Sequence, residues 1–101
     1  MRISHQARLV LQAFLDAPEA ETYGFRLTQA TGLKAGTLYP VLQRLLEEGW
    51  LSSRWEEIDE HAAGRRRRRY YRLTAEGERG ARAAIGSDTP ALHWFMPGWA
   101  R

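Results

Sequence analysis

The chain has 101 residues, 44% of them hydrophobic and 27% charged, which suits one small globular domain and excludes a dinucleotide-binding fold or a (β/α)₈ barrel of about 250 residues. It has no cysteine, which excludes disulfides, thiolate nucleophiles and sulfur-ligated zinc. No apolar run approaches the ~20 residues of a membrane span, and no signal peptide is recognisable, so we expect a cytoplasmic protein. The net charge is only +3, but the uninterrupted run Arg65 to Arg69 favours an anionic partner.

The first predicted helix runs from Ser4 to Asp16. Its apolar residues recur at helical spacing: Ile3, Ala7, Val10, Leu11, Phe14 and Leu15. Ser4 suits the N-cap, and Pro18 ends the pattern. Leu9 lies off this apolar face, so we expect it to contact something other than the core of its own domain.

Two further helices are predicted close together. One spans about residues 24–31, with Thr22 available as its cap and Gly32 suited to the left-handed position after its end. The other spans about residues 35–48 and is ended by Gly49. Two helices joined by so short a turn containing glycine are typical of a helix-turn-helix.

The second of these helices has an apolar face and a polar face. The apolar face carries Leu38, Leu42, Leu45 and Leu46. The opposite face, with Tyr39 at its edge, carries Gly36, Thr37, Pro40, Gln43, Arg44 and Glu47. Proline costs little only in the first turn of a helix, so Pro40 moves the expected helix start toward Gly36. The polar face fits a DNA major groove, although it could instead be an ordinary solvated face, against which the phenol of Tyr39 argues.

From Trp50 onward the apolar period changes to two, which predicts a β-hairpin whose second strand runs from Arg67 to Leu73 and whose loop spans residues 59–64. One antiparallel register places the apolar side chains on a common face. It pairs Leu51 with Leu73, Ser53 with Tyr71, and Trp55 with Arg69. On the other face, Glu56 would lie opposite Arg68.

The basic end of the hairpin has two interpretations. Acidic residues precede the arginines, and the pairs Glu56–Arg68 and Glu57–Arg67 could neutralise part of their charge. Four arginines would then stay less compensated: Arg65, Arg66, Arg69 and Arg72. In the other interpretation this end is a wing that lies along DNA phosphates or enters a minor groove. The helix pair and the basic hairpin together favour nucleic-acid binding.

Thr74 is the predicted cap of a last helix that reaches about Ile85 and is weakened by three glycines. We therefore expect one domain over residues 1–86 and a separate tail over residues 87–101. The tail contains the apolar residues Leu92, Trp94, Phe95, Met96 and Trp99. They could pack on the first helix of a partner chain around Leu9 and form a dimer, pack on their own chain, or form a flat pocket for a small hydrophobic effector.

Several runs resemble the PadR-like family of transcriptional regulators. The run from Thr37 to Gly49, TLYPVLQRLLEEG, resembles the recognition helix of that family, and Tyr23-Gly-Phe-Arg-Leu precedes it. The run from Gly64 to Gly77, GRRRRRYYRLTAEG, resembles the wing and the turn after it. The resemblance covers about residues 9–77. It implies a mainly α fold with a β-hairpin (α+β), the winged helix-turn-helix, which binds DNA as a homodimer and usually acts as a repressor.

The resemblance also indicates which residues contact DNA. The recognition helix supplies Thr37, Tyr39, Pro40, Gln43 and Arg44, and the wing supplies Arg65, Arg66, Arg67 and Arg68. Lys34 stands near a position where the family often has serine, and it can reach a phosphate instead of capping the helix. The family's C-terminal dimerisation helix is shortened and weakened by glycines here. If the apolar tail packs on a partner chain, the dimer is expected to use Leu9, Leu92, Trp94, Phe95 and Trp99. Some family members respond to phenolic or drug-like compounds.

Nothing in the sequence predicts an enzyme, a metal site or a cofactor. The three histidines are far apart and match no metal-ligand spacing, and no glycine-rich phosphate loop is present. The favoured hypothesis is a sequence-specific DNA-binding regulator, a repressor that binds a palindromic operator as a homodimer. The alternative is a winged-helix protein-interaction module whose polar helix face binds another protein without sequence-specific DNA binding.

Overall fold

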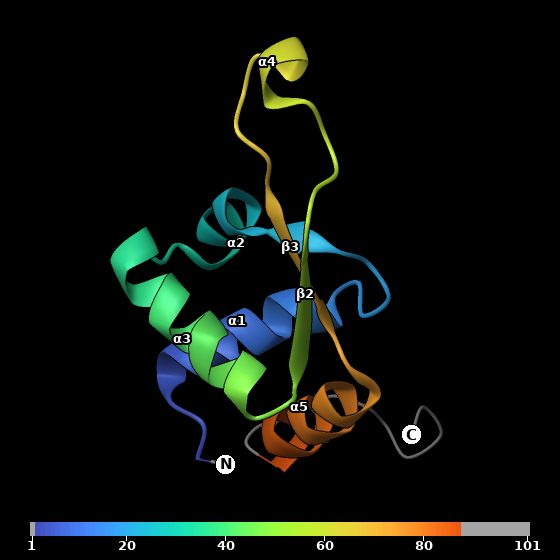
Figure 1. The fold of residues 1–101 in the computed structure, drawn as a ribbon. Coiled ribbons are helices and arrows are strands. Elements are labelled where there is room, and N and C mark those ends of the chain that lie inside the picture. The colour runs from blue at the N-terminus through green and yellow to red at the C-terminus, as the bar shows by residue number, and fades with distance from the viewer. Residues whose placement is uncertain (1, 88–101) are drawn as a thin grey trace.

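The computed structural model describes residues 2–87, so the predicted tail contacts of Leu92, Trp94, Phe95 and Trp99 lie outside the described residues. The elements follow in the order α1 (His5–Leu15), β1 (Thr22–Tyr23), α2 (Gly24–Thr31), α3 (Ala35–Glu47), β2 (Leu51–Trp55), α4 (Glu60–Ala63), β3 (Arg69–Leu73) and α5 (Ala75–Ser87). The β2–β3 hairpin extends away from the larger helices and carries α4 at its far end (Figure 1). The predicted mainly α fold with a hairpin, the winged helix-turn-helix, is confirmed.

The sheet has three antiparallel strands in the order β1-β3-β2. The strand β1 was not predicted, because two residues are too short to show an alternating pattern. Thr22 pairs with Tyr71 in β3, so the prediction that Thr22 caps α2 was wrong. The N-cap of α2 is Tyr23, whose side chain makes no capping bond.

The first helix begins as predicted. The Ser4 hydroxyl accepts a hydrogen bond of 3.1 Å from the Ala7 N–H, which satisfies one of the free donors at the start of α1. Four side chains of α1 are buried: Ala7, Val10, Leu11 and Phe14. Leu9, which lies off this face, is half-buried.

The turn between α2 and α3 contains Gly32 at φ +75°, in the left-handed conformation expected of it. Pro40 departs from the prediction, because α3 starts at Ala35 and places Pro40 in the second turn. Proline has no N–H, so the Gly36 carbonyl loses its usual partner within the helix. Gly36 is exposed, and its carbonyl can therefore bond to water.

The hairpin register is confirmed at every predicted pair: Leu51 with Leu73, Ser53 with Tyr71, and Trp55 with Arg69. Leu51, Tyr71 and Leu73 are buried, whereas Trp55 is 56% exposed because it lies beyond the reach of the core. The predicted loop contains the short helix α4, which is capped by the Asp59 carboxylate.

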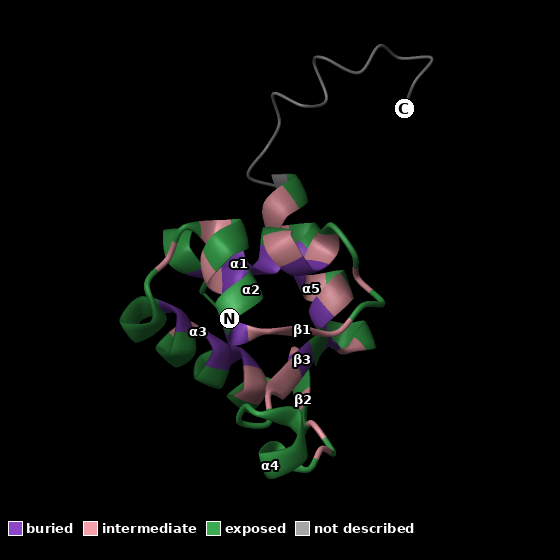
Figure 2. Ribbon diagram, turned by 90° about the horizontal axis from the view of Figure 1, so that it is seen from above, coloured by how far each residue is buried: buried purple, intermediate pink, exposed green. Residues whose placement is uncertain are grey.

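The core lies between the helices and the base of the sheet. Buried side chains come from α1, α2, α3, both hairpin strands and α5, and they include Val10, Leu11, Phe14, Leu27, Leu38, Leu42, Leu45, Leu51, Tyr71, Leu73 and Ala81. Figure 2 shows the buried segments at the centre of the molecule and an exposed α4 away from them. The far end of the wing therefore contributes nothing to the core.

The last helix is longer than its glycine content suggested, reaching Ser87. Thr74 is confirmed as its cap, since its hydroxyl accepts from the Gly77 N–H at 2.9 Å and donates to the Gly49 carbonyl at 2.7 Å. A side chain at Gly77 would collide with the Trp50 carbonyl, and one at Gly80 would collide with the Trp50 ring. The two glycines lower helix propensity but allow α5 to pack closely against the start of the hairpin.

Gly77→Ala is therefore expected to destabilise the fold by about 1–3 kcal/mol, because the added methyl has no space against the Trp50 backbone. The measurement is the free energy of unfolding in urea. Gly86→Ala is the matched control, since a methyl there meets no atom within 4 Å and removes a glycine from a helix. A Gly77→Ala variant as stable as the Gly86→Ala variant would contradict this account of the packing.

Candidate nucleic-acid interface

The helix α3 exposes the polar face predicted for it. Its buried leucines, Leu38, Leu42 and Leu45, face the core and fix the rotation of the helix. All the predicted contact residues of this helix are exposed: Thr37, Tyr39, Pro40, Gln43 and Arg44. The structure thus brings these side chains to the surface of one helix.

The start of α3 carries favourable electrostatics for an anion. Lys34 is the N-cap and is exposed, and its side chain makes no capping bond, as expected for lysine. Its carbonyl accepts from the N–H groups of Thr37 at 3.0 Å and Leu38 at 2.9 Å. The first turn contains no acidic residue, so the partial positive charge of the helix N-terminus and the Lys34 ammonium act together.

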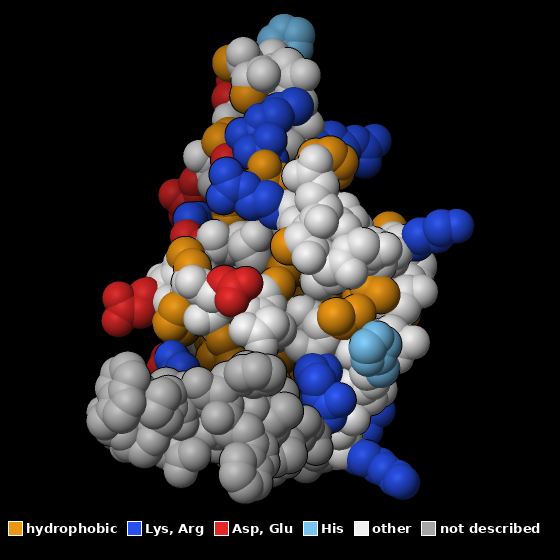
Figure 3. Space-filling model, turned by 180° about the vertical axis from the view of Figure 1, so that it is seen from behind, with side chains coloured by type: hydrophobic (Ala, Val, Ile, Leu, Met, Phe, Trp, Pro, Cys, Tyr) orange, Lys and Arg blue, Asp and Glu red, His pale blue; other side chains and the backbone are white. Residues whose placement is uncertain are grey.

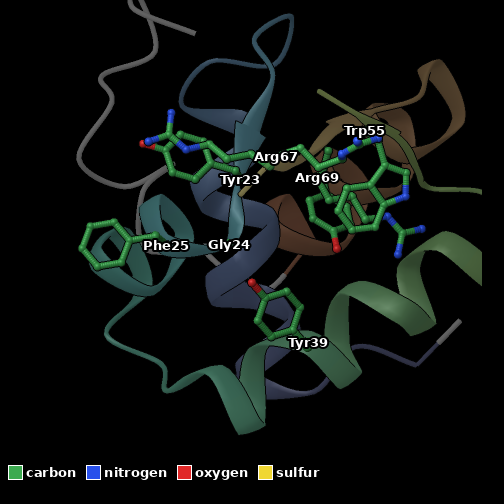
Figure 4. A pocket seen from close by; sticks show the side chains of 9 residues that line it. Tyr23, Gly24, Phe25, Tyr39, Trp55, Arg67 and Arg69 are labelled. Atoms are coloured by element: carbon green, nitrogen blue, oxygen red, sulfur yellow. The ribbon is translucent and has the colours of Figure 1, made fainter. Parts of the chain in front are cut away.

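Tyr39 is 47% exposed, and its ring extends toward Gly24 at the start of α2 (Figure 4). A side chain at position 24 would collide with the Tyr39 hydroxyl. Gly24 therefore provides the space that the phenol occupies. The ring is supported on one side by α2 while its other side stays open to solvent.

The arginines of the wing form ion pairs with other partners than those predicted. The Glu56 carboxylate accepts from Arg65 Nη1 at 2.7 Å and Nη2 at 3.0 Å, and from the Arg68 N–H at 3.1 Å. Glu56 and Arg68 do lie opposite each other, but only the Arg68 backbone contacts the carboxylate. Arg67 pairs with Glu60 rather than with Glu57, at 3.9 Å, and its N–H donates to Glu60 at 2.7 Å.

The physical reason for these different pairs is the turn at the wing tip. After α4, Gly64 adopts φ +71° and returns the chain toward β2, which brings Arg65 back over Glu56. The predicted pairs came from extending the regular strand register toward the loop, which treats the backbone there as extended and does not include this turn. The prediction that Arg65 is poorly compensated was therefore wrong.

Two arginines at the base of the wing are bound to the sheet. The Arg68 guanidinium lies 4.3 Å from the centre of the Tyr23 ring. Arg69 donates to the Ser53 hydroxyl at 2.9 and 3.1 Å and lies 5.8 Å from the Trp55 ring centre. Arg66 differs, because it is exposed and forms no ion pair with any of residues 2–87.

The pair of Arg65 with Glu56, here called the wing clamp, keeps the Glu56 carboxylate ionised. Hydrogen bonds from the Arg65 guanidinium lower the pKa of the Glu56 carboxyl from 4.5 to about 2, against a smaller opposing effect of burial. The backbone N–H of Arg68 contributes to the same lowering of the pKa. The Glu56 side chain is 16% exposed, and the Arg65 guanidinium covers its carboxylate. Of the other arginines in the run, Arg66 and Arg67 are exposed on this anchored loop.

A hollow of about 470 Å³ joins the two predicted contact regions (Figure 4). Tyr39 of α3 borders it on one side and Arg67 and Arg68 of the wing on the other. Phe25 and Trp55 also line it, and neither was among the predicted contact residues. Phe25 lies in the run Tyr23-Gly-Phe-Arg-Leu that resembles the family, next to Gly24 at the start of α2, and Trp55 ends the apolar face of β2.

Figure 3 shows basic side chains gathered on the wing, with hydrophobic side chains beside them, and further basic side chains lower on the same face. No helix within residues 2–87 is long and apolar enough to cross a membrane. Over the same residues, no group of three or more acidic or histidine side chains could hold a metal ion.

Two helices joined by a glycine turn, an exposed polar face on the second helix and a basic β-hairpin define a winged helix-turn-helix protein. Residues 16–83, more than half of the chain, match the family model described as the transcriptional regulator PadR-like family. The protein belongs to the PadR-like family of transcriptional regulators, and this membership implies DNA binding rather than enzymatic activity.

Known transcriptional regulators are similar to this protein over most of its chain. The transcriptional regulator Rv3488 of Mycobacterium tuberculosis is 36% identical over 97 residues, which cover 91% of this chain and 82% of that protein. A PadR family transcriptional regulator of Eggerthella lenta is 28% identical with a TM-score of 0.67, covering 86% and 77% of the two chains. A PadR family regulator of Clostridium difficile shares the fold with a TM-score of 0.70 at 22% identity, over 95% and 98% of the chains.

Glu56→Gln should lower the free energy of unfolding at neutral pH, because the amide cannot replace the charged pair with Arg65. The pKa of Glu56 is lower in the folded state, so its stabilising effect is present above about pH 4.5 and is lost as the pH falls through about 2. Urea unfolding of wild type and Glu56→Gln across this pH range should show that the difference between their free energies of unfolding shrinks toward pH 2. Glu57→Gln is the control and should match wild type; a Glu56→Gln difference that did not change with pH would refute the clamp.

Proposed function

We propose that the protein is a repressor that binds a palindromic operator as a homodimer, with α3 in a major groove and the wing on the adjacent strand. The observation that carries the proposal is the continuity of the surface, since one hollow links Tyr39 of α3 to Arg67 of the wing. An exposed polar helix face and a basic hairpin on one continuous surface are what this mode of DNA binding requires.

Within this proposal the contacts divide by chemistry. The residues that meet base edges are Thr37, Tyr39, Pro40 and Gln43. The Thr37 hydroxyl and the Gln43 amide read hydrogen-bonding groups, and the small surface of Pro40 allows close approach. Lys34 and Arg44 contact phosphates beside the groove, and Arg44 can also reach guanine. The wing contacts are Arg65, Arg66, Arg67 and Arg68. Of these, Arg66 contributes most, because it is exposed and has no ion pair within the described residues, whereas Arg65 is paired with Glu56 and Arg68 is stacked on Tyr23.

The proposed dimer explains how one small domain reads a palindrome. Leu9 is half-buried on α1 and contributes to the interface together with Leu92, Trp94, Phe95 and Trp99 of the tail. The same aromatic tail is the proposed location for a small hydrophobic effector. Membership of a family of transcriptional regulators supports DNA binding over the alternative of a protein-interaction module.

In-vitro selection from random duplex DNA should enrich two inverted half-sites whose centres lie about one helical turn, or 10–10.5 base pairs, apart. Sedimentation of the complex should give two chains per duplex. Enrichment of a single half-site with one chain bound would refute the dimer, and failure to enrich any sequence would refute sequence-specific binding. Repression is tested with a promoter carrying the selected site upstream of a reporter, whose output should fall when the protein is added.

Two substitutions separate the proposed roles of wing and helix. Arg66→Ala should weaken binding to all duplexes and lower the slope of log affinity against log salt by about 1, because one phosphate contact is lost. Gln43→Ala should keep the salt slope and relax the preference at one base position, with a cost of about 1–3 kcal/mol for the selected sequence only. Fluorescence anisotropy at several salt concentrations measures both effects. Variants indistinguishable from wild type would refute this arrangement on DNA.

A further inference from the structure

The hollow between α3 and the wing gathers the most exposed aromatic rings of the described chain. Among residues 2–87, the large hydrophobic side chains that are exposed are Phe25 at 65%, Tyr39 at 47% and Trp55 at 56%. All three line this hollow, although they come from three different elements (Figure 4). Single exposed apolar residues are common, but convergence on one concavity is typical of a binding surface.

The same hollow is positively charged. Arg67, Arg68 and Arg69 line it, and its lining contains no carboxylate. Arg68 is stacked on Tyr23, and Arg69 is bonded to Ser53, so two of the three charges are held in place before any ligand arrives. The surface therefore offers aromatic faces beside oriented cations.

This combination complements a nucleic-acid strand better than a protein or a neutral ligand. Each deoxyribose has an apolar surface that packs on a ring, and each phosphate is an anion that pairs with a guanidinium. A volume of about 470 Å³ in an open hollow has room for part of such a strand. The position also fits, because a DNA strand separates the major groove from the minor groove and must cross between α3 and the wing.

We propose that the aromatic hollow binds the sugar–phosphate strand that runs between the two grooves, with Phe25 and Trp55 packed on deoxyribose and Arg69 directed at a phosphate. The inference rests on the proposed function and adds three residues to the interface. These residues strengthen binding to any DNA sequence. The two rings do so without releasing counterions, which distinguishes them from the arginines of the wing.

The experiment uses the full chain and two fluorescein-labelled duplexes, one carrying the selected site and one of random sequence. Phe25→Ala and Trp55→Ala should each weaken binding to both duplexes by the same factor, about five- to tenfold, with the salt slope unchanged. Trp55→Phe should restore most of the affinity. Gln29→Ala is the control, because this exposed residue of α2 does not line the hollow. Circular dichroism confirms that each variant is folded.

Trp55 also reports directly on the hollow. The difference in acrylamide quenching between wild type and Trp55→Phe isolates this residue from the other tryptophans, and saturating duplex should protect it. The inference would be overturned if wild type binds duplex, both alanine variants bind it equally well, and Trp55 stays accessible to acrylamide. The proposed function would then still stand. Protection by naphthalene sulfonate but not by duplex would overturn it in favour of a small aromatic anion. Absence of duplex binding by wild type would instead overturn the proposed function.

Discussion

Burial of the leucines of α3 is the constraint on which the interface depends. Leu38, Leu42 and Leu45 are almost completely removed from water, and each contributes about 1.5–3 kcal/mol to the hydrophobic free energy of folding. Rotating α3 to hide its polar face would expose these three side chains at once. Packing energy therefore determines that Thr37 and Gln43 face outward, although neither residue takes part in the core.

The arginine run of the wing is held in place by acidic and aromatic partners. Five consecutive arginines repel one another, and without partners they would keep the hairpin tip extended and mobile. Glu56 and Glu60 bind the segment that follows α4 and neutralise Arg65 and part of Arg67. Stacking on Tyr23 and bonding to Ser53 hold Arg68 and Arg69 against the sheet. The acidic residues before the run thus order the loop and leave Arg66 free to meet an anion.

Much of the fold and the exposure of the polar face of α3 were predictable, because they follow from short-range periodicity. The helices, the hairpin register and the caps Ser4 and Thr74 follow from apolar spacing and hydroxyl positions that act within a few residues. Other features depended on contacts between distant segments. The strand β1 exists only because β3 pairs with it, and the glycines of α5 are explained only by Trp50. The pairing of Arg65 with Glu56 required the turn at the wing tip.

The sequence alone determined the class of the molecule, because the PadR-like motif, the leucine face of α3 and the arginine run are local patterns that need no coordinates. Tertiary structure decided which charges remain available and which aromatic rings line the same hollow. Phe25, Tyr39 and Trp55 are separated along the chain and share no spacing rule, yet the packing of α2, α3 and the hairpin brings them to one hollow. Such convergence is a property of how the elements pack in three dimensions, which no local pattern encodes.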